Sequence, residues 1–373
     1  MSTLDNLKKE VLFMKKIYFR TDGHEEIATG HIMRCLSIAR ACTALHAEVC
    51  FLMSDETSKT ILEERFLIPN EFNVRCLNSD YQSPETELPA LRKLLTEEKG
   101  NWLFIDSYFV TEHYLSELKR LCQIAYLDDI LAFDYPADLL INYDVTYEPN
   151  CYHKASQKLL GTSYTPLREQ FQNVYYEVRP QVQNILLSTG GTDTYNVAGE
   201  LLNKLFQSTH QTAPDNYTPQ KDFAPSALPN YHYHVVTSRL NSHYEELQKI
   251  AAANPTIHIH ENVQDMASLM CQCDLSISAG GTTLYELCAV GVPAISFAMA
   301  DNQLTAVETF SAQNIIPYAG DVRDSFSDVL DTMLAFLNEQ SSSMEARKKS
   351  SHAMRAFIDG KGAMRIAKVL TTQ

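Results

Sequence analysis

One histidine lies where a general base is expected, in the segment Thr29-Gly30-His31-Ile32-Met33-Arg34. The segment follows a predicted strand, Lys16–Arg20, and opens a predicted helix, Ile32–Leu45, so it should lie at the carboxyl edge of a parallel sheet, where ligands bind. The positive end of a helix disfavours imidazolium, and a neutral, partly exposed His31 can take a proton from water. Gly30 lets a ligand approach the backbone closely. A solvent-facing polar turn explains the same residues, so both interpretations stay open.

Two glycine pairs follow predicted strands further along the chain. Gly190-Gly191 comes after Asn184–Ser188, and Gly280-Gly281-Thr282-Thr283 comes after Asp274–Ser278. Each should offer free backbone N–H groups at a helix N-terminus, which is a place for phosphate. Because there are two such loops, we expect a diphosphate between them. Neither loop is a P-loop, since GxxxxGK[ST] is missing, and the dinucleotide fingerprint GxGxxG is missing as well.

Glu286 has two interpretations that its spacing does not separate. Thr283-x-x-Glu286 fits a capping box, in which the carboxylate only closes the start of the helix. Alternatively, the carboxylate accepts hydrogen bonds from the two hydroxyls of a ribose beside the phosphates.

Polar residues also follow other predicted strands. Asp106-Ser107-Tyr108 and Asp128-Asp129 should reach the edge where His31 lies, and could orient His31 or hold a polar sugar. Asp at a strand end also caps the next helix, which is the competing explanation. Asn302 and Gln303 follow the predicted strand Pro293–Phe297, and their side-chain amides suit either sugar recognition or simple loop chemistry.

No group of residues has the spacing of a metal site. His232, His234, His258 and His260 alternate on predicted strands, so a metal is conceivable, but satisfied or exposed strand histidines are the favoured explanation. Cys271 and Cys273 are too close for a zinc knuckle. We therefore predict no metal and no cofactor.

These residues are placed by alternating strand and helix patterns, which predict an α/β protein with parallel sheets. A punctuated segment, 161–183, separates two similar halves. We expect domains at 1–170 and 171–373, the second interrupted at about 207–230 by a polar, Pro-containing surface excursion. The predicted strands are Lys16–Arg20, Glu48–Met53, Asn73–Cys76, Trp102–Ile105, Ile124–Leu127, Leu139–Ile141, Lys158–Leu160, Asn184–Ser188, His232–Thr237, Thr256–His260, Asp274–Ser278, Pro293–Phe297 and Ile315–Tyr318.

Composition narrows the classes of function. The 373 residues include 46 Asp and Glu against 31 Lys and Arg, a net charge of −15, which argues against nucleic acid and anionic membranes as partners. Nine scattered Cys without a CxxC pair are typical of thiols in a reducing cytosol. The polar segment Met1–Met14 does not have the pattern of a signal peptide, so we expect a cytoplasmic protein.

Four segments together resemble the family of UDP-sugar hydrolases of pseudaminic acid biosynthesis. That family hydrolyses UDP-2,4-diacetamido-2,4,6-trideoxy-β-L-altropyranose and is related to the spore-coat protein SpsG and, more remotely, to MurG-type glycosyltransferases. The segments are Arg20–Cys35, Leu159–Phe171, Ile185–Asn196 and Asp274–Gln303, of which the last is the most specific. The sequence departs from the family at Ala28, where Gly is usual.

The resemblance implies a GT-B fold, in which two Rossmann-like, doubly wound domains face a cleft and UDP binds mainly to the C-terminal domain. It places the catalytic base on His31, the ribose-binding acid on Glu286, the phosphate loops on Gly190-Gly191 and Gly280-Gly281, and the sugar-facing pair on Asn302 and Gln303. The further substrate-binding residues that we predict are Gly30, Arg34, Asp106, Tyr108, Thr282 and Thr283.

The chemistry that follows is hydrolysis of a UDP-sugar, the small-molecule partner, with inversion at C1 and without metal. One neutral histidine would activate water, and the diphosphate leaves without a strong general acid. A GT-B glycosyltransferase that uses a UDP-sugar is the alternative, because the same loops and Glu286 would serve it. A non-catalytic binding protein is a third class. The presence of His31 together with a complete UDP-binding segment argues against it.

Overall fold

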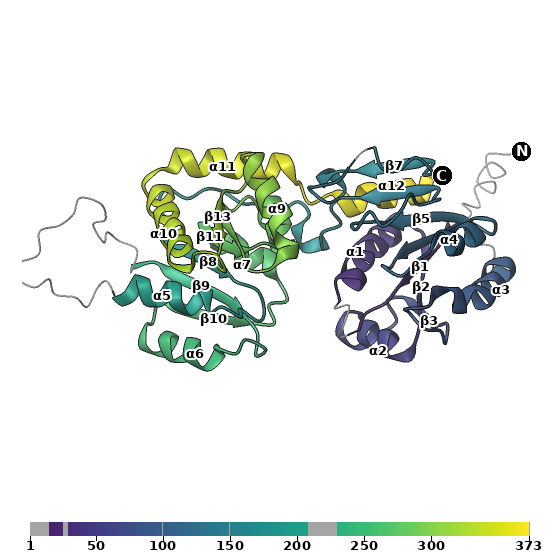
Figure 1. Cartoon of the computed structure of the whole chain (residues 1–373), viewed down its shortest axis with the longest axis horizontal. Coiled ribbons are helices and arrows are strands. Elements are labelled where there is room, and N and C mark those ends of the chain that lie inside the picture. The colour runs from purple at the N-terminus through teal and green to yellow at the C-terminus, as the bar shows by residue number, and fades with distance from the viewer. Residues whose placement is uncertain (1–14, 25–28, 99, 149, 208–229, 373) are drawn as a thin grey trace, which may run out of the picture. The chain divides into compact units, whose positions relative to one another are not determined.

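The computed structural model describes residues 15–24, 29–98, 100–148, 150–207 and 230–372 (Figure 1). The chain forms two compact units. The N-terminal unit comprises the described residues up to Arg168 together with those from Lys361 onward, and the C-terminal unit spans Glu169–Gly360. The segment Met1–Met14, Ala28 and the predicted excursion, apart from its ends, lie outside the described residues.

The N-terminal unit is built on a parallel sheet with the strand order β3-β2-β1-β4-β5-β6-β7. The chain order reverses between β1 and β4, and ligands of doubly wound sheets bind at the carboxyl ends of the strands at such a point. The strands are β1 (Lys16–Thr21), β2 (Glu48–Met53), β3 (Asn73–Cys76), β4 (Trp102–Asp106), β5 (Gln123–Leu127), β6 (Leu139–Asn142) and β7 (Gln157–Leu160).

Helices cover both faces of this sheet. One apolar core joins the sheet to α1, α2 and α12, and a second core joins the opposite face to α3 and α4. The helices are α1 (Gly30–Ala44), α2 (Glu56–Arg65), α3 (Leu88–Glu98), α4 (Glu112–Lys119) and α12 (Gly362–Thr372).

The C-terminal unit repeats this plan with a six-stranded parallel sheet in the order β10-β9-β8-β11-β12-β13. Its core packs α5, α6 and α10 against one face. The strands are β8 (Asn184–Ser188), β9 (His232–Thr237), β10 (Ile257–Glu261), β11 (Leu275–Ala279), β12 (Ala294–Ala298) and β13 (Tyr318–Asp321). The helices are α5 (Val197–Gln207), α6 (Tyr244–Ala253), α7 (Met266–Gln272), α8 (Thr282–Val290), α9 (Asp301–Ala312), α10 (Phe326–Ser342) and α11 (Met344–Phe357).

The last helix departs from the predicted domain 171–373. The apolar face of α12, which carries Ile366 and Leu370, packs into the same core as Ile32 and Leu36 of α1 (Figure 1). The chain therefore returns to the N-terminal unit after Gly360.

The predicted strands match the observed ones to within one residue at most ends, with one exception. The strand predicted at Ile315–Tyr318 is observed at Tyr318–Asp321. The amides of Ile315 and Ile316 instead bond back to the Phe310 carbonyl at the end of α9, and Pro317 has no amide to contribute to a ladder.

Candidate active site

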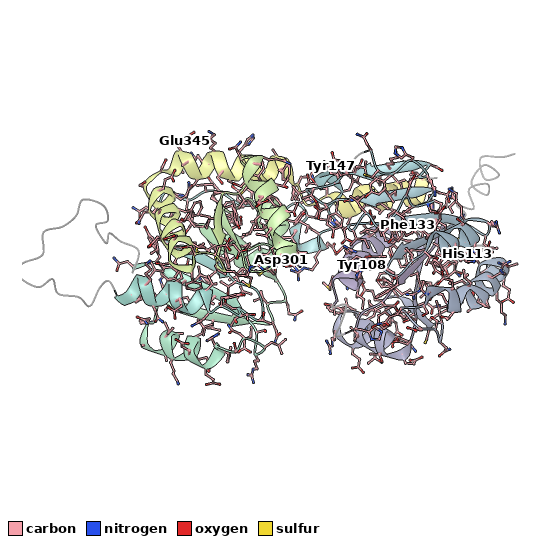
Figure 2. All side chains as sticks on the ribbon, viewed as in Figure 1. Tyr108, His113, Phe133, Tyr147, Asp301 and Glu345 are labelled. Atoms are coloured by element: carbon pink, nitrogen blue, oxygen red, sulfur yellow. The ribbon has the colours of Figure 1, made fainter. Side chains whose placement is uncertain are left out.

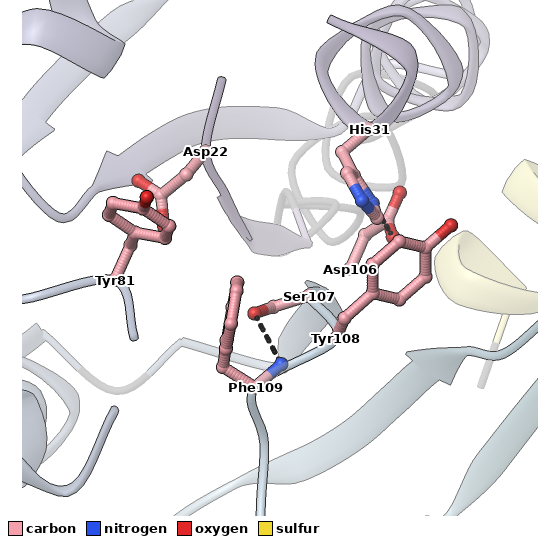
Figure 3. A pocket seen from close by; sticks show the side chains of 7 residues that line it. All are labelled: Asp22, His31, Tyr81, Asp106, Ser107, Tyr108 and Phe109. Carbon is pink, nitrogen blue, oxygen red and sulfur yellow. Dashed lines mark hydrogen bonds and ion pairs between the residues drawn. The ribbon is translucent and has the colours of Figure 1, made fainter. Parts of the chain in front are cut away.

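A small pocket opens where β1 and β4 end in the N-terminal unit (Figure 3). It encloses about 200 Å³, part of which is open to solvent. The first turn of α1 supplies His31, which the structure places beside the end of β4. The other lining residues are Asp22, Tyr81, Asp106, Ser107, Tyr108 and Phe109.

His31 is held by a carboxylate rather than left as a solvent-facing turn residue. It is only 5% exposed, and its Nδ1 lies 2.6 Å from Oδ1 of Asp106. Burial raises the pKa of Asp106, but the charge of Arg34 and the contact with His31 outweigh burial and keep that pKa below its usual range. Asp106 is thus an acceptor, which assigns the proton to Nδ1 and leaves Nε2 of His31 as the basic nitrogen.

Arg34 lies one turn after His31 on α1 and binds two carboxylates. Its Nε and one terminal nitrogen each contact an oxygen of Asp106 at 2.6 Å, and the other terminal nitrogen lies 2.5 Å from Asp129. That nitrogen also donates to the Tyr143 hydroxyl at 3.2 Å. The guanidinium is therefore committed to fixing Asp106, and through it the ring of His31.

Tyr108 forms the wall beside His31. The two rings meet edge to face with centroids 4.4 Å apart, and the Tyr108 hydroxyl donates to Asp129 at 3.1 Å. Burial and the charge of Asp129 raise the pKa of Tyr108, so the hydroxyl stays protonated. Tyr108 remains 43% exposed and can contact a ligand (Figure 2).

A buried ion network lies behind the pocket, and sequence reasoning missed it. Arg20 on β1 is 2% exposed and pairs with Asp22 and with Glu87, whose carboxylate also accepts from the Tyr114 hydroxyl. Arg20 and Glu87 are 67 residues apart, so no local pattern joins them. Asp22 also accepts from the amide and the hydroxyl of Ser54, which fixes the end of β1.

Gly30, the first residue of α1, is exposed, and a side chain added there would meet no atom within 4 Å. Among the residues that the structure describes, the space beside Gly30 is therefore open.

In the C-terminal unit, the N-terminus of α8 has no side-chain cap. Gly281 is the N-cap residue and makes no side-chain cap, and it is exposed together with Thr282. The first amides of a helix, here those of Thr282 and Thr283, have no intrahelical acceptor. Gly280 differs in that its amide bonds to the Phe297 carbonyl and α9 packs against it.

The helix start decides between the two interpretations of Glu286. A capping box needs Ser or Thr at the N-cap, but α8 begins at Thr282, so Thr283 lies inside the first turn. The capping-box interpretation is therefore wrong. Glu286 is half-buried on the second turn of this open helix.

The Gly190-Gly191 loop does not offer a free helix N-terminus, which corrects that expectation. Asp193 is buried, and its carboxylate accepts from the amides of Val197 and Ala198 at the start of α5. Its Oδ2 also accepts from the Thr189 hydroxyl at 2.9 Å. The carboxylate of Asp193 thus binds the helix amides that were predicted to bind phosphate. A ligand could still contact the backbone of the Gly190-Gly191 loop, where Gly190 has a φ of 85°.

Asn302 and Gln303 lie in the first turn of α9 rather than in a loop. Gln303 accepts from the Met299 amide at 2.9 Å, so its carbonyl has a structural task. Asn302 is exposed, and its side chain has no hydrogen bond within the described part of the chain.

The four strand histidines bond to one another across β9 and β10. Nδ1 of His232 lies 2.9 Å from Nε2 of His258, and Nδ1 of His234 lies 3.0 Å from Nε2 of His260. Asn184 on β8 bonds the remaining nitrogen of His234 at 3.1 Å. We call these four residues the histidine ladder. Across the described ranges, no three His, Cys, Asp or Glu residues are placed to hold a metal ion. No described helix is long and apolar enough to cross a membrane.

Known proteins resemble the chain in sequence. Residues 187–355 match the glycosyltransferase family 28 C-terminal domain. The spore coat polysaccharide biosynthesis protein SpsG of Bacillus subtilis is 24% identical over 94% of this chain and 96% of its own length. UDP-2,4-diacetamido-2,4,6-trideoxy-β-L-altropyranose hydrolase of Campylobacter jejuni is 23% identical over 73% of this chain and 87% of its own. An uncharacterised protein of Methanocaldococcus jannaschii is 26% identical over 75% of this chain. The matched region covers only 55% of the length of that protein.

The fold also has solved relatives. MurG of Acinetobacter baumannii superposes with a TM-score of 0.65 at 14% identity, covering 96% of this chain and all of that one. The two parallel-sheet, Rossmann-like units are those of the GT-B fold, as the sequence predicted. The distant sequence relatives include both proteins with which the resemblance was drawn.

Proposed function

We propose that this protein is a hydrolase of a UDP-sugar, which cleaves the glycosyl C1–O bond and releases UDP and the free sugar with inversion. The relatives named for spore coat polysaccharide biosynthesis and for hydrolysis of a UDP-linked diacetamido-trideoxy sugar support this class of substrate. The same relatives favour a substrate of that diacetamido-trideoxy type, in biosynthesis of a pseudaminic-acid-like sugar.

The observation that carries the proposal is the pairing of His31 with Asp106 at 2.6 Å. With Nδ1 protonated, Nε2 takes a proton from water while the water oxygen bonds to C1. The bond between C1 and the diphosphate breaks with its electron pair on the phosphate oxygen. UDP is a good leaving group, so the step needs charge stabilisation more than a strong acid.

The C-terminal unit would bind the nucleotide. The exposed N-terminus of α8 presents backbone donors and a positive helix end, which suit a diphosphate. Glu286, released from the capping role, would accept the ribose hydroxyls. The Gly190-Gly191 loop and Asn302 would add contacts to the phosphates and to the sugar.

A glycosyltransferase is the second candidate, because the matched family domain and the fold relative MurG both belong to that class. His31 would then deprotonate an acceptor hydroxyl instead of water. The two activities differ only in what occupies the position next to Nε2.

A panel of UDP-sugars incubated without acceptor, with UDP release measured in H₂¹⁸O, tests the proposal. We expect UDP release, the label on the C1 hydroxyl of the sugar, and inversion in the first-formed anomer. Release that begins only when an acceptor sugar is added would favour the transferase. Label on the phosphate would mean attack at phosphorus, and would make the protein a pyrophosphatase.

A further inference from the structure

The pocket beside His31 has aromatic walls with no role in the proposed proton transfer. The rings of Tyr81 and Phe109 meet edge to face with centroids 5.4 Å apart (Figure 3). The ring of His24 stacks on that of Tyr81 with centroids 4.3 Å apart. Tyr108 closes the side next to His31. The rings of Tyr81, Phe109 and Tyr108 thus line the pocket beside His31.

The carboxylates that line the same pocket are already engaged. Oδ1 of Asp22 accepts from Ser54 and its other oxygen pairs with Arg20, while both oxygens of Asp106 are bound by Arg34 and His31. Their remaining capacity for sugar hydroxyls is small. Recognition in this pocket therefore depends mainly on the aromatic surface.

The charge around the pocket is negative. The cluster behind it contains the carboxylates of Asp22, Glu87, Asp106 and Asp129 against the guanidinium groups of Arg20 and Arg34. A substituent that carries its own carboxylate would be repelled there. The pocket is small and partly open to solvent, so it admits one substituent of a substrate and not a complete sugar nucleotide.

We propose that Phe109 and Tyr81 bind a methyl group of the sugar, either a 6-deoxy methyl or the methyl of an acetamido group, and that the pocket rejects uronates. This inference rests on the proposed function and assigns these two residues to substrate specificity. A methyl group against the aromatic rings gains apolar burial, whereas a hydroxymethyl or carboxylate there loses hydration and meets only the Ser107 hydroxyl, which already accepts from the Phe109 amide.

The test compares UDP-6-deoxyglucose, UDP-N-acetylglucosamine, UDP-glucose and UDP-glucuronate, with kcat/KM from UDP release and Kd from calorimetry. We expect at least one methyl-bearing sugar to exceed UDP-glucose by about 10- to 200-fold in kcat/KM, the range for one methylene-sized group in an apolar pocket. The preferred compound identifies the source of the methyl group. UDP-glucuronate should be the poorest of the four.

Phe109→Ala should remove most of that preference, in kcat/KM and in Kd, while the affinity for UDP alone is retained. Phe109→Tyr keeps the ring and adds a hydroxyl, so it should also weaken the preference for the methyl group. This variant serves as the test if Phe109→Ala does not fold. Tyr175→Ala, an exposed aromatic residue of the C-terminal unit, is the matched control and should keep the preference.

The two proposals fail in different ways. A wild-type protein that binds the sugars with the methyl preference but releases no UDP from any of them would refute the hydrolase alone. Turnover or binding without a methyl preference, or a preference that survives in both Phe109 variants, would overturn the assignment of Phe109 and Tyr81.

Discussion

The His31 cluster, which comprises His31, Arg34, Asp106 and Asp129, differs from the N-terminus of α8 in almost every physical respect. In the cluster, the charged side chains are mostly buried and bond to one another at 2.5–2.6 Å. At the start of α8, Gly281 and Thr282 are exposed, and no side chain caps the first backbone amides of the helix.

The difference reflects what each site has to do. A base must be held in one tautomer and one orientation before substrate arrives, and a buried network provides that. An anion site needs donors that no internal acceptor has taken, which an uncapped helix N-terminus provides. The Gly190-Gly191 loop shows the opposite case, because Asp193 already occupies the start of α5.

His31→Asn should produce the largest effect, since it removes the base without touching the nucleotide site. We expect kcat to fall by about 10²- to 10⁴-fold, with little change in the affinity for UDP. Steady-state kinetics and calorimetry measure the two quantities. His113→Asn, an exposed residue of α4, is the control. Near-wild-type turnover in His31→Asn would refute the assignment of the base.

Asp106→Asn should test whether orientation of the base matters as much as its presence. The amide has only one acceptor oxygen, and its NH₂ group would be a donor that faces a donor of Arg34 or His31, so at least one charge-assisted bond worth about 1.5–3 kcal/mol is lost, and kcat should fall about ten- to 150-fold. The melting temperature should fall as well, because Arg34 loses a buried partner. Asp129→Asn removes a partner of Arg34 without touching His31, and should lower stability with a smaller effect on kcat. Equal kcat losses in the two variants would contradict the orienting role.

Glu286→Gln tests the proposed nucleotide site at the N-terminus of α8. We expect the affinity for UDP to weaken by about 1.5–3 kcal/mol with a smaller effect on the melting temperature, because Gln keeps the shape of the side chain and Glu286 does not cap α8. Glu345→Gln, in the first turn of α11, controls for the loss of one charge. Unchanged affinity together with a lower melting temperature would restore a structural role for Glu286.

Alanine substitutions at the adjacent glycines Gly280 and Gly281 distinguish an effect on packing from an effect on ligand binding. A Cβ on Gly280 would lie 2.6 Å from Val307 Cγ1 and 2.9 Å from Gln303 Cβ, so Gly280→Ala should destabilise the unit by about 1–3 kcal/mol. A Cβ on Gly281 would meet nothing within 4 Å, and the backbone there is extended. Gly281→Ala should cost about 1 kcal/mol or less in stability and should weaken UDP binding several-fold if phosphate lies against that backbone. Melting curves and calorimetry on both variants check this, and full UDP affinity in Gly281→Ala would place the phosphates elsewhere.

The sequence predicted the positions of most strands and therefore which residues reach the sheet edges. Short apolar runs and glycine turns are local signals, and they placed His31, Asp106 and the α8 loop at the carboxyl ends of strands, where the structure has them. The pairing of Arg20 with Glu87 and the return of α12 onto α1 depend on contacts between distant parts of the chain, which no local pattern contains. The capping by Asp193 was missed for another reason: α5 begins at Val197, later than the glycine pair suggested.

Acidification should affect the two units differently, and the histidine ladder is the cause in the C-terminal unit. Burial, together with the neighbouring histidines, lowers the pKa of His234 to about 4, and burial and His258 lower that of His260. The unfolded chain therefore binds protons first, so this stabilisation is complete above about pH 6.5 and is lost as the pH falls toward 4. Because these side chains are half-exposed, we expect a loss on the order of 1 kcal/mol.

Urea melts between pH 7 and 4.5 should therefore show that the wild-type protein loses stability as the pH falls. His234→Gln should reduce this loss, because Gln carries no titrating group. His352→Gln, at an exposed position, is the control. The comparison with kinetics then separates the units. A rate that falls on acidification while UDP still binds reports protonation of the base in the N-terminal unit, whereas loss of UDP binding over the same range reports the C-terminal unit. An identical acid loss of stability in the wild-type and His234→Gln proteins would remove the ladder from the explanation.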